Sequence, residues 1–194
     1  MENKEGTKII EFEPKEISDF TLIVDNTHFK VHKAILMVNS SVFTSLLRNT
    51  KEDYINLTGR TNHNVTWILL FLNEIYCTED SKLSSDNIDI VLFYADFYDV
   101  KFLSKKCDIL VSKMYPDFPQ ISVKNLVEIL NIFCNISCKY NLPVSTEKGI
   151  DLLFKNYSLR YIRECVRVEN WNKNMGSLSK GMLLKIININ ADKL

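Results

Sequence analysis

The stretch that decides the fold is Ser18–Phe43, which reads SDFTLIVDNTHFKVHKAILMVNSSVF. Apolar residues alternate with other residues up to Val24 and again from Phe29 to Val31, which is typical of half-buried strands. Between the two runs lies Asp25-Asn26-Thr27, and short polar side chains of this kind bond their own backbone in turns. The pattern therefore predicts a β-hairpin.

The second half of the stretch has helical spacing. A helical turn is expected from Ala34 after the break at His32-Lys33. Ser40-Ser41 offers a hydroxyl cap for a further helix, in which Phe43 and Leu47 lie one turn apart. No catalytic pattern is present here, so we interpret the stretch as a scaffold.

Composition is that of a soluble globular protein. The chain has 194 residues, 46% hydrophobic and 25% charged, enough for one ample domain or a domain with a helical extension. Lys plus Arg and Asp plus Glu number 24 each, and no basic block stands out. This balance disfavours nucleic acid and anionic membranes as partners.

The chain shows no sign of export or membrane insertion. The N-terminus, MENKEGTKII, lacks the apolar core of a signal peptide, and no apolar run reaches the roughly eighteen residues of a membrane span. We expect an intracellular protein, cytoplasmic or nuclear. Five cysteines are accordingly predicted to be reduced and buried: Cys77, Cys107, Cys134, Cys138 and Cys165.

Outside the hairpin stretch, residues 1–17 form a polar arm in which Ile9, Ile10 and Phe12 suit a short strand or a packed segment. Residues 54–57 predict a third strand. Helices are predicted after the caps Asn64 and 84–86, then over 103–114, 122–137 and 145–157, with shorter ones near 161–166 and 183–187. The buried face after Asn64 is expected to comprise Val65, Ile68, Leu69, Leu72 and Tyr76. Pro116 and Pro119 mark a boundary, and Pro143 is expected to end a helix.

No set of residues predicts an enzyme, a metal site or a cofactor site. His32 has apolar neighbours and is expected to bond nearby backbone, and Asp19 is expected to do the same in a turn. Cys134, Cys138 and His63 lack the second ligand pair typical of zinc sites. Phosphate-binding glycine loops and nucleophile motifs are also missing from the sequence.

Four groups of residues occur in an order that resembles the BTB/POZ family followed by a partial BACK-like helical extension. They are Ser18-Asp19 with His32, Leu36, Ser40 and Phe43; Ile75-Tyr76; Ala95-Asp96-Phe97-Tyr98 with Leu103 and Cys107; and Ser122-Val123-Lys124-Asn125 with Glu128-Ile129-Leu130. The resemblance implies an α+β fold, with a small three-stranded sheet capped by a helical cluster and an all-α extension. It divides the chain into an arm (1–17), a BTB/POZ domain (18–115) and the extension (120–194).

The resemblance also implies a function in protein–protein binding, as an adaptor that links a partner to a cullin-type ubiquitin ligase. The implied partner-binding residues are Glu52 and Tyr54, with Thr50 in place of the family's apolar residue, and Tyr76. The family's dimerisation helix has no counterpart before Asp19, which disfavours the usual homodimer.

Two alternative functions stay open. No kelch, MATH or zinc-finger pattern follows the predicted BTB/POZ domain, so the chain could instead be a decoy that occupies cullins or other BTB proteins. The abundance of Asn, Ile and Lys is compatible with a large DNA virus as its source. A self-assembling structural protein is the other alternative.

Overall fold

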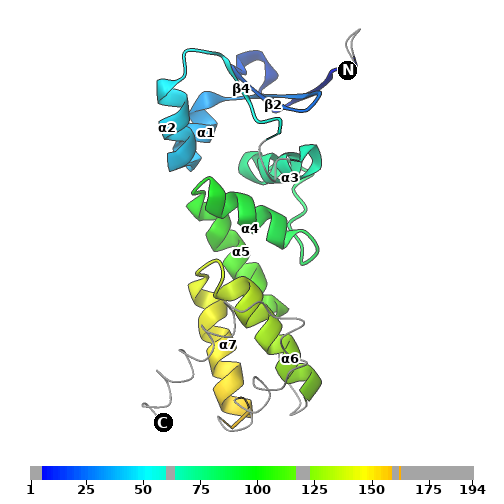
Figure 1. The fold of residues 1–194 in the computed structure, drawn as a ribbon, viewed down its shortest axis with the longest axis vertical. Coiled ribbons are helices and arrows are strands. Elements are labelled where there is room, and N and C mark those ends of the chain that lie inside the picture. The colour runs from blue at the N-terminus through cyan, green and yellow to red at the C-terminus, as the bar shows by residue number, and fades with distance from the viewer. Residues whose placement is uncertain (1–5, 60–63, 117–122, 159–161, 163–194) are drawn as a thin grey trace. The chain divides into compact units, whose positions relative to one another are not determined.

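A computed structural model describes residues 6–59, 64–116, 123–158 and 162, except for the side chains of 123–125, 127 and 134. The chain forms two compact units, Met1–Ser104 and Lys105–Leu194. Figure 1 shows the sheet with α1 to α4 in the first unit, and α6 and α7 in the second. The predicted α+β class is confirmed.

The sheet of the first unit is built on the predicted hairpin. β2 (Phe20–Val24) and β3 (Thr27–Val31) pair antiparallel, with Leu22 opposite Phe29. The turn between them is made by Asp25, whose φ of 51° lies in the left-handed region that Asp tolerates better than most residues. The predicted third strand is also present, because β4 (Tyr54–Asn56) pairs parallel to β2.

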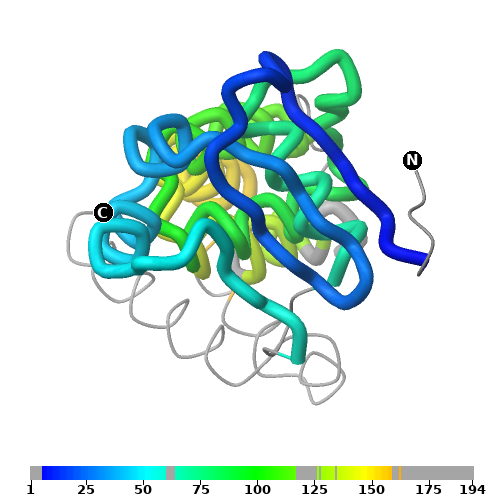
Figure 2. The backbone as a smooth tube through the Cα atoms, turned by 90° about the horizontal axis from the view of Figure 1, so that it is seen from above, coloured from blue at the N-terminus to red at the C-terminus, as the bar shows by residue number. Residues whose placement is uncertain are grey.

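A fourth strand comes from the N-terminal arm. β1 (Lys8–Glu11) pairs parallel to β3, which gives the order β1-β3-β2-β4 instead of the three-stranded sheet expected from the resemblance. Figure 2 shows this segment, in dark blue, running alongside the hairpin. The arm joins the sheet because β3 would otherwise present unpaired backbone groups along that edge.

Two short helices follow the hairpin. α1 (Lys33–Asn39) and α2 (Ser41–Asn49) meet at Ser40, whose Oγ accepts a hydrogen bond from Phe43 N at 2.9 Å. The predicted cap of the second helix is therefore confirmed. Phe43 and Leu47 are buried, and the Phe43 ring stacks on Tyr98 with centroids 4.4 Å apart.

The third helix agrees with prediction at its start but not along its buried face. α3 (Val65–Tyr76) is capped by Asn64, whose Oδ1 accepts from Thr66 N at 2.8 Å. Its buried apolar residues are Ile68, Phe71, Leu72 and Ile75, while Val65, Leu69 and Tyr76 are only half-buried. The buried face is rotated because α4 packs against this helix and takes up Phe71, whose ring contacts Tyr94.

Two further predictions in the first unit were wrong. Cys77 was expected to be buried but is exposed, because it ends α3 in the left-handed conformation at φ 49°. Ser84 was expected to cap α4 (Ile88–Phe97) together with its neighbours, but it lies in the preceding turn, where its N–H donates to Asn87 Oδ1 at 2.9 Å.

α5 (Lys101–Met114) is followed by the helices of the second unit, α6 (Val123–Ile132) and α7 (Pro143–Asn156). A π-helical turn, Phe133–Ser137, directly follows α6. Pro143 begins α7, where the prediction had it end the preceding helix, since proline is well tolerated at the first position of a helix. The helices predicted near 161–166 and 183–187 lie outside the described residues, apart from position 162.

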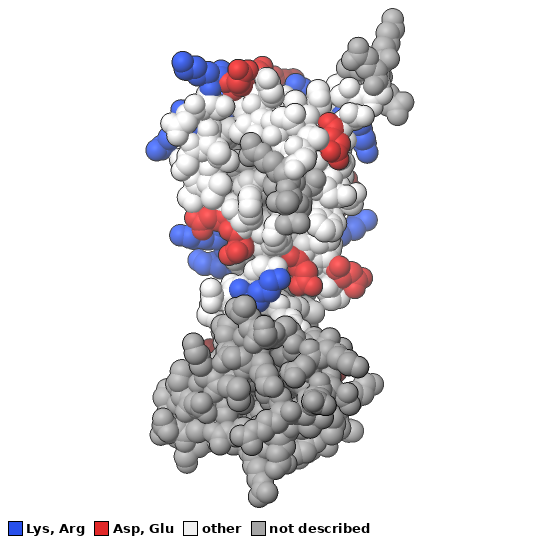
Figure 3. All heavy atoms as spheres, in the orientation of Figure 1, with Lys and Arg blue, Asp and Glu red and all other residues white. Residues whose placement is uncertain are grey.

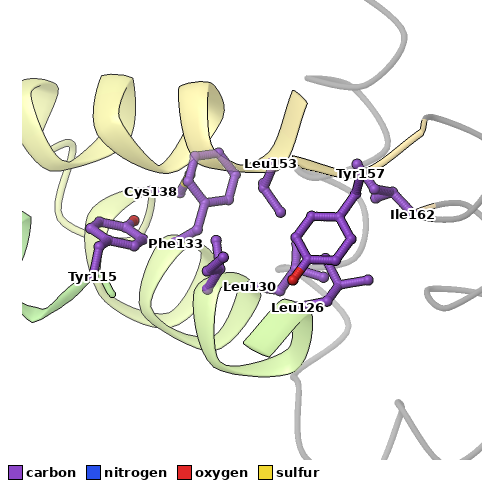
Figure 4. Packing of buried hydrophobic residues seen from close by; sticks show 9 residues of the cluster. Tyr115, Leu126, Leu130, Phe133, Cys138, Leu153, Tyr157 and Ile162 are labelled. Carbon is purple, nitrogen blue, oxygen red and sulfur yellow. The ribbon is translucent and has the colours of Figure 1, made fainter. Parts of the chain in front are cut away.

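The second unit has its own apolar core between α6 and α7 (Figure 4). Tyr115, Phe133 and Leu153 are among its buried members, and Ser137 Oγ lies 3.0 Å from the Tyr115 hydroxyl. Cys138 also belongs to this core, and burial raises the pKa of its thiol to about 11. This thiol therefore packs as a small apolar group.

The start of α7 is capped from a distant element. The buried Asp108 carboxylate, on α5, accepts hydrogen bonds from Val144 N at 2.9 Å and from Ser145 N at 2.8 Å. Its negative charge lies at the positive end of the α7 helix dipole, which stabilises this arrangement. The cap thus joins two segments of the second unit that are 36 residues apart in sequence.

Candidate protein-interaction surface

A groove of about 560 Å³ lies on the first unit between α1, α2 and the start of α5. We call it the α1–α2 groove, and its lining includes Met37, Val38, Thr44, Asp99 and Phe102. Its volume is within the range of small-ligand pockets, but it is open to solvent and lined mainly by short helical side chains. It is therefore an open surface groove and not an enclosed cavity.

Two hydrogen bonds hold the walls of the groove in place. Ser40 Oγ donates to Tyr98 O at 2.5 Å, and Ser41 Oγ donates to Asp99 Oδ2 at 2.5 Å. Both bonds join the corner between α1 and α2 to the loop that precedes α5. The geometry depends on Asp99 adopting a left-handed φ of 50°.

Exposed apolar side chains line the groove. Val38 is 85% exposed, and Phe102, in the first turn of α5, is 37% exposed. Asp99 and Lys101 supply one charge of each sign in the same groove. The groove therefore offers an apolar contact beside charged groups, which suits one face of an amphipathic helix.

The predicted partner-binding residues 50–54 lie beyond the C-terminal end of α2. Thr50 follows the last residue of that helix, Glu52 is exposed, and Tyr54 is 44% exposed at the start of β4. Ser45 lines the groove and lies five residues before Thr50, about 7–8 Å along a helix axis. The groove is thus lined by the middle of α2, and residues 50–54 follow the end of the same helix.

Tyr76, the fourth predicted partner-binding residue, points into the first unit. Its hydroxyl oxygen accepts from His32 N at 2.8 Å and lies 3.0 Å from His32 Nδ1, and its ring stacks on Phe12 with centroids 4.4 Å apart. Burial raises the pKa of Tyr76 to about 12. The hydrogen bond from the His32 backbone acts to lower this pKa, and the Asp19 charge acts to raise it.

His32 connects three segments of the first unit. Its Nε2 lies 2.8 Å from Pro14 O, and because a carbonyl only accepts, the neutral ring carries its proton on Nε2. Nδ1 then accepts from the Tyr76 hydroxyl. The buried imidazole has a hydrogen-bond partner at each ring nitrogen, which explains its position at the end of β3.

The remaining signature residues hold the fold together. Asp19 Oδ1 accepts from Lys33 N at 2.7 Å and so joins β2 to the start of α1. Asp96 is exposed on α4. Phe97 is 52% exposed, whereas six further signature residues are buried: Leu36, Ser40, Phe43, Ala95, Leu103 and Cys107.

Sequence reasoning singled out Ser40 and Ser41 of the groove but missed its most exposed apolar residue. Val38 carried no motif, and its exposure follows from how α1 is packed. Phe12 was considered only as part of the arm, yet it is 3% exposed. A signal was available for Asp99, because an acidic residue at the end of a helix is suited to a left-handed turn.

Two searches of the described residues concern metal-ligand clusters and membrane-spanning helices. Across these ranges no group of three or more His, Cys, Asp and Glu side chains could hold a metal ion. His63 and the Cys134 side chain lie outside the described part of the structure. None of the helices in the described part of the chain is long and apolar enough to cross a bilayer. Acidic and basic side chains are interspersed on the face of the first unit in Figure 3.

Comparison with known proteins identifies the family. A model of the BTB/POZ domain matches residues 11–115, more than half of the chain. The BTB and MATH domain-containing protein 42 of Caenorhabditis elegans is 28% identical over 124 residues, which are 61% of this chain and 28% of that protein. The matched part of the chain thus spans less than a third of the length of this relative.

Two solved BTB domains are also similar to this chain. The BTB domain of human Gigaxonin has 26% sequence identity and a TM-score of 0.40, covering 48% of this chain and 76% of that one. The BTB domain of zebrafish PATZ1 has 18% identity and a TM-score of 0.42, covering 50% of this chain and 76% of that one. The family match over residues 11–115 establishes that the chain belongs to the BTB/POZ domain family.

Proposed function

We propose that this chain is an adaptor that links a partner protein to a cullin-type ubiquitin ligase. BTB/POZ domains are protein–protein interaction modules, and the family membership of residues 11–115 supports that class of function. The observation that carries the proposal is the α1–α2 groove, which exposes the apolar Val38 and is lined by α2, the helix that precedes Thr50.

The energetics of the groove favour a macromolecular partner. Burying a valine side chain contributes about 1.5–3 kcal/mol, and Val38 at 85% exposure has most of that contribution still available. Tyr54 adds a half-exposed aromatic residue, a type enriched in binding hot spots. We therefore assign the cullin contact to the groove together with Thr50, Glu52 and Tyr54.

Tyr76 is given a different part in this proposal. Because its hydroxyl bonds His32 and its ring stacks on Phe12, binding a partner through Tyr76 would first require breaking these contacts. We propose that Tyr76 supports the fold beneath the arm and does not contact the cullin.

Calorimetric titration of the full chain with a cullin N-terminal domain tests the assignment. Val38→Asp introduces a charge at the apolar contact and is expected to weaken binding at least about tenfold. Ile17→Asp is the matched control, because Ile17 is 65% exposed and lies in the arm outside the groove. Equal weakening by both variants, or by neither, would contradict the proposed surface.

A second pair of variants tests the end of α2. Tyr54→Ala is expected to weaken cullin binding, while Trp67→Ala, which removes an aromatic residue of similar exposure on α3, is expected to leave it unchanged. The reverse result would place the contact on α3.

Co-purification separates an adaptor from the decoy alternative. An adaptor is expected to bring down a cullin together with a further protein, and the binding of that further protein should depend on residues outside the groove. A decoy would bring down only cullins or BTB proteins, and a self-assembling protein only copies of itself.

The domain limits belong to the same proposal: an arm at 1–17, the BTB/POZ domain at 18–115, and α6 and α7 as the start of a partial BACK-like extension at 120–194.

A further inference from the structure

The N-terminal arm covers a surface of the first unit to which it is weakly attached. Between Lys8 and Ile17 only Phe12 is buried; Ile9 and Ile10 are half-buried and the other residues are exposed. One buried aromatic side chain, a short strand, the Pro14–His32 hydrogen bond and a bond from Lys8 N to Asn26 O at 2.8 Å hold about ten residues against the entropy of release. Segments with so little burial open locally more readily than a core strand does.

The surface beneath the arm can be defined from the backbone pairing. The Thr21 amide donates to the carbonyl just before β4 at 2.9 Å, so the backbone groups of Thr21 face β4. The backbone N–H and C=O groups of neighbouring residues in a strand point to opposite edges. Those of Leu22 therefore face β3, and those of its partner Phe29 face β2. The backbone groups of His28 and Lys30 consequently face β1, and release of the arm would leave them unpaired.

Release of the arm would also uncover two side-chain features. The face of the Tyr76 ring against Phe12 would become accessible, and His32 Nε2 would lose its acceptor at Pro14 O. Together with the edge of β3 these features form one continuous binding site, which we call the arm site. It accepts an extended strand, an aromatic side chain and a carbonyl oxygen.

We propose that the arm is a displaceable strap over a strand-addition site, and that an extended segment of a partner protein replaces it. The segment would pair parallel to β3, place an aromatic side chain on Tyr76 and offer a carbonyl to His32. Strand addition of this kind gains affinity from main-chain hydrogen bonds and specificity from side-chain pockets. The arm site is separate from the α1–α2 groove, so it does not depend on the proposed cullin contact.

Amide hydrogen exchange, followed by NMR on the full chain, tests whether the strap opens. The His28 and Lys30 amides are expected to exchange faster than the Phe29 and Val31 amides, which face β2. In Phe12→Ala the first pair is expected to exchange at least about tenfold faster still, with the second pair unchanged. If all four amides exchange at one rate in the wild type, the arm opens only with global unfolding and the proposal is wrong.

Binding in trans tests the occupant. A labelled peptide of residues 6–18 is expected to bind Phe12→Ala more tightly than the wild type, because the variant's own arm competes less well. Ile17→Ala, which changes an exposed arm residue, should bind the peptide no better than the wild type. No gain in Phe12→Ala would refute the site, and concentration-dependent dimerisation of that variant would show that the occupant is a second copy.

Discussion

Gly149→Ala is expected to destabilise the second unit, although alanine is the better helix former. Gly149 lies on α7 against the core shown in Figure 4. A Cβ at this position would lie 2.6 Å from Phe133 Cδ2, 2.6 Å from the Tyr115 hydroxyl oxygen and 3.0 Å from Tyr115 Cζ. Real Cβ atoms do not approach other atoms so closely, so one of these rings or the helix must move.

The magnitude follows from three competing effects. Overpacking a close-packed core costs about 1–3 kcal/mol. Moving Tyr115 away from Ser137 loses a buried hydrogen bond of about 1 kcal/mol. The higher helix propensity of alanine returns about 1 kcal/mol. The two smaller effects nearly cancel, so the free energy of unfolding should fall by about 1–3 kcal/mol.

Urea unfolding of the full chain, followed by circular dichroism, measures this change. Asp151→Ala is the control, because Asp151 is exposed on the same helix and its substitution should change stability little. Tyr115→Phe removes the hydroxyl that the added Cβ would meet, so it should cost less in the Gly149→Ala background than in the wild type. A Gly149→Ala protein as stable as the wild type, or more stable, would refute the close approach of α7 to Tyr115.

Three further predictions concern single side chains. Asp108→Asn removes the charge of the α7 cap and replaces one of its two accepting oxygens by an NH2 donor, so the free energy of urea unfolding should fall by about 1–3 kcal/mol; an unchanged urea midpoint would contradict the cap. Tyr76 should ionise near pH 12, measured as the difference in ultraviolet absorbance titration between wild type and Tyr76→Phe. Since its pKa is raised above the usual 10, its contribution to stability is intact below pH 10 and is lost as the pH rises through 12; a midpoint near 10 would disprove the burial. Cys77 should react quickly with a thiol reagent and Cys138 slowly, followed at each of the two sites by peptide mass spectrometry, and labelling of Cys138 as fast as that of Cys77 would contradict this order.

Local patterns made much of the first unit predictable. Alternation and turn chemistry specify the β2–β3 hairpin, and a hydroxyl cap with apolar residues one turn apart specifies the start of α2. These features depend on residues close in sequence, so their physical causes are visible in the sequence. Asn64, whose side chain bonds Thr66 N two residues away, is recognisable for the same reason. Asp19 differs, because its hydrogen bond reaches Lys33 N, 14 residues along the chain.

The features that sequence reasoning missed depend on distant residues. A short strand was one of two expectations for the arm, but its pairing as a fourth strand depends on the open edge of β3, and α7 begins at Pro143 because Asp108 supplies the cap from α5. The exposure of Val38 and the stacking of Tyr76 on Phe12 likewise depend on what packs beside them. The family resemblance indicated that Tyr76 could meet a partner, but its contacts with His32 and Phe12 are set by the tertiary structure.

Size-exclusion chromatography with light scattering tests the central claim most directly. The full chain, whose protomer mass is 22.6 kDa, is mixed with a cullin N-terminal domain and the mass of the eluting species is measured. The proposed function predicts a complex that contains both proteins and that Val38→Asp, but not Ile17→Asp, prevents at low micromolar concentration. Separate elution of the two wild-type proteins at that concentration would contradict the adaptor function.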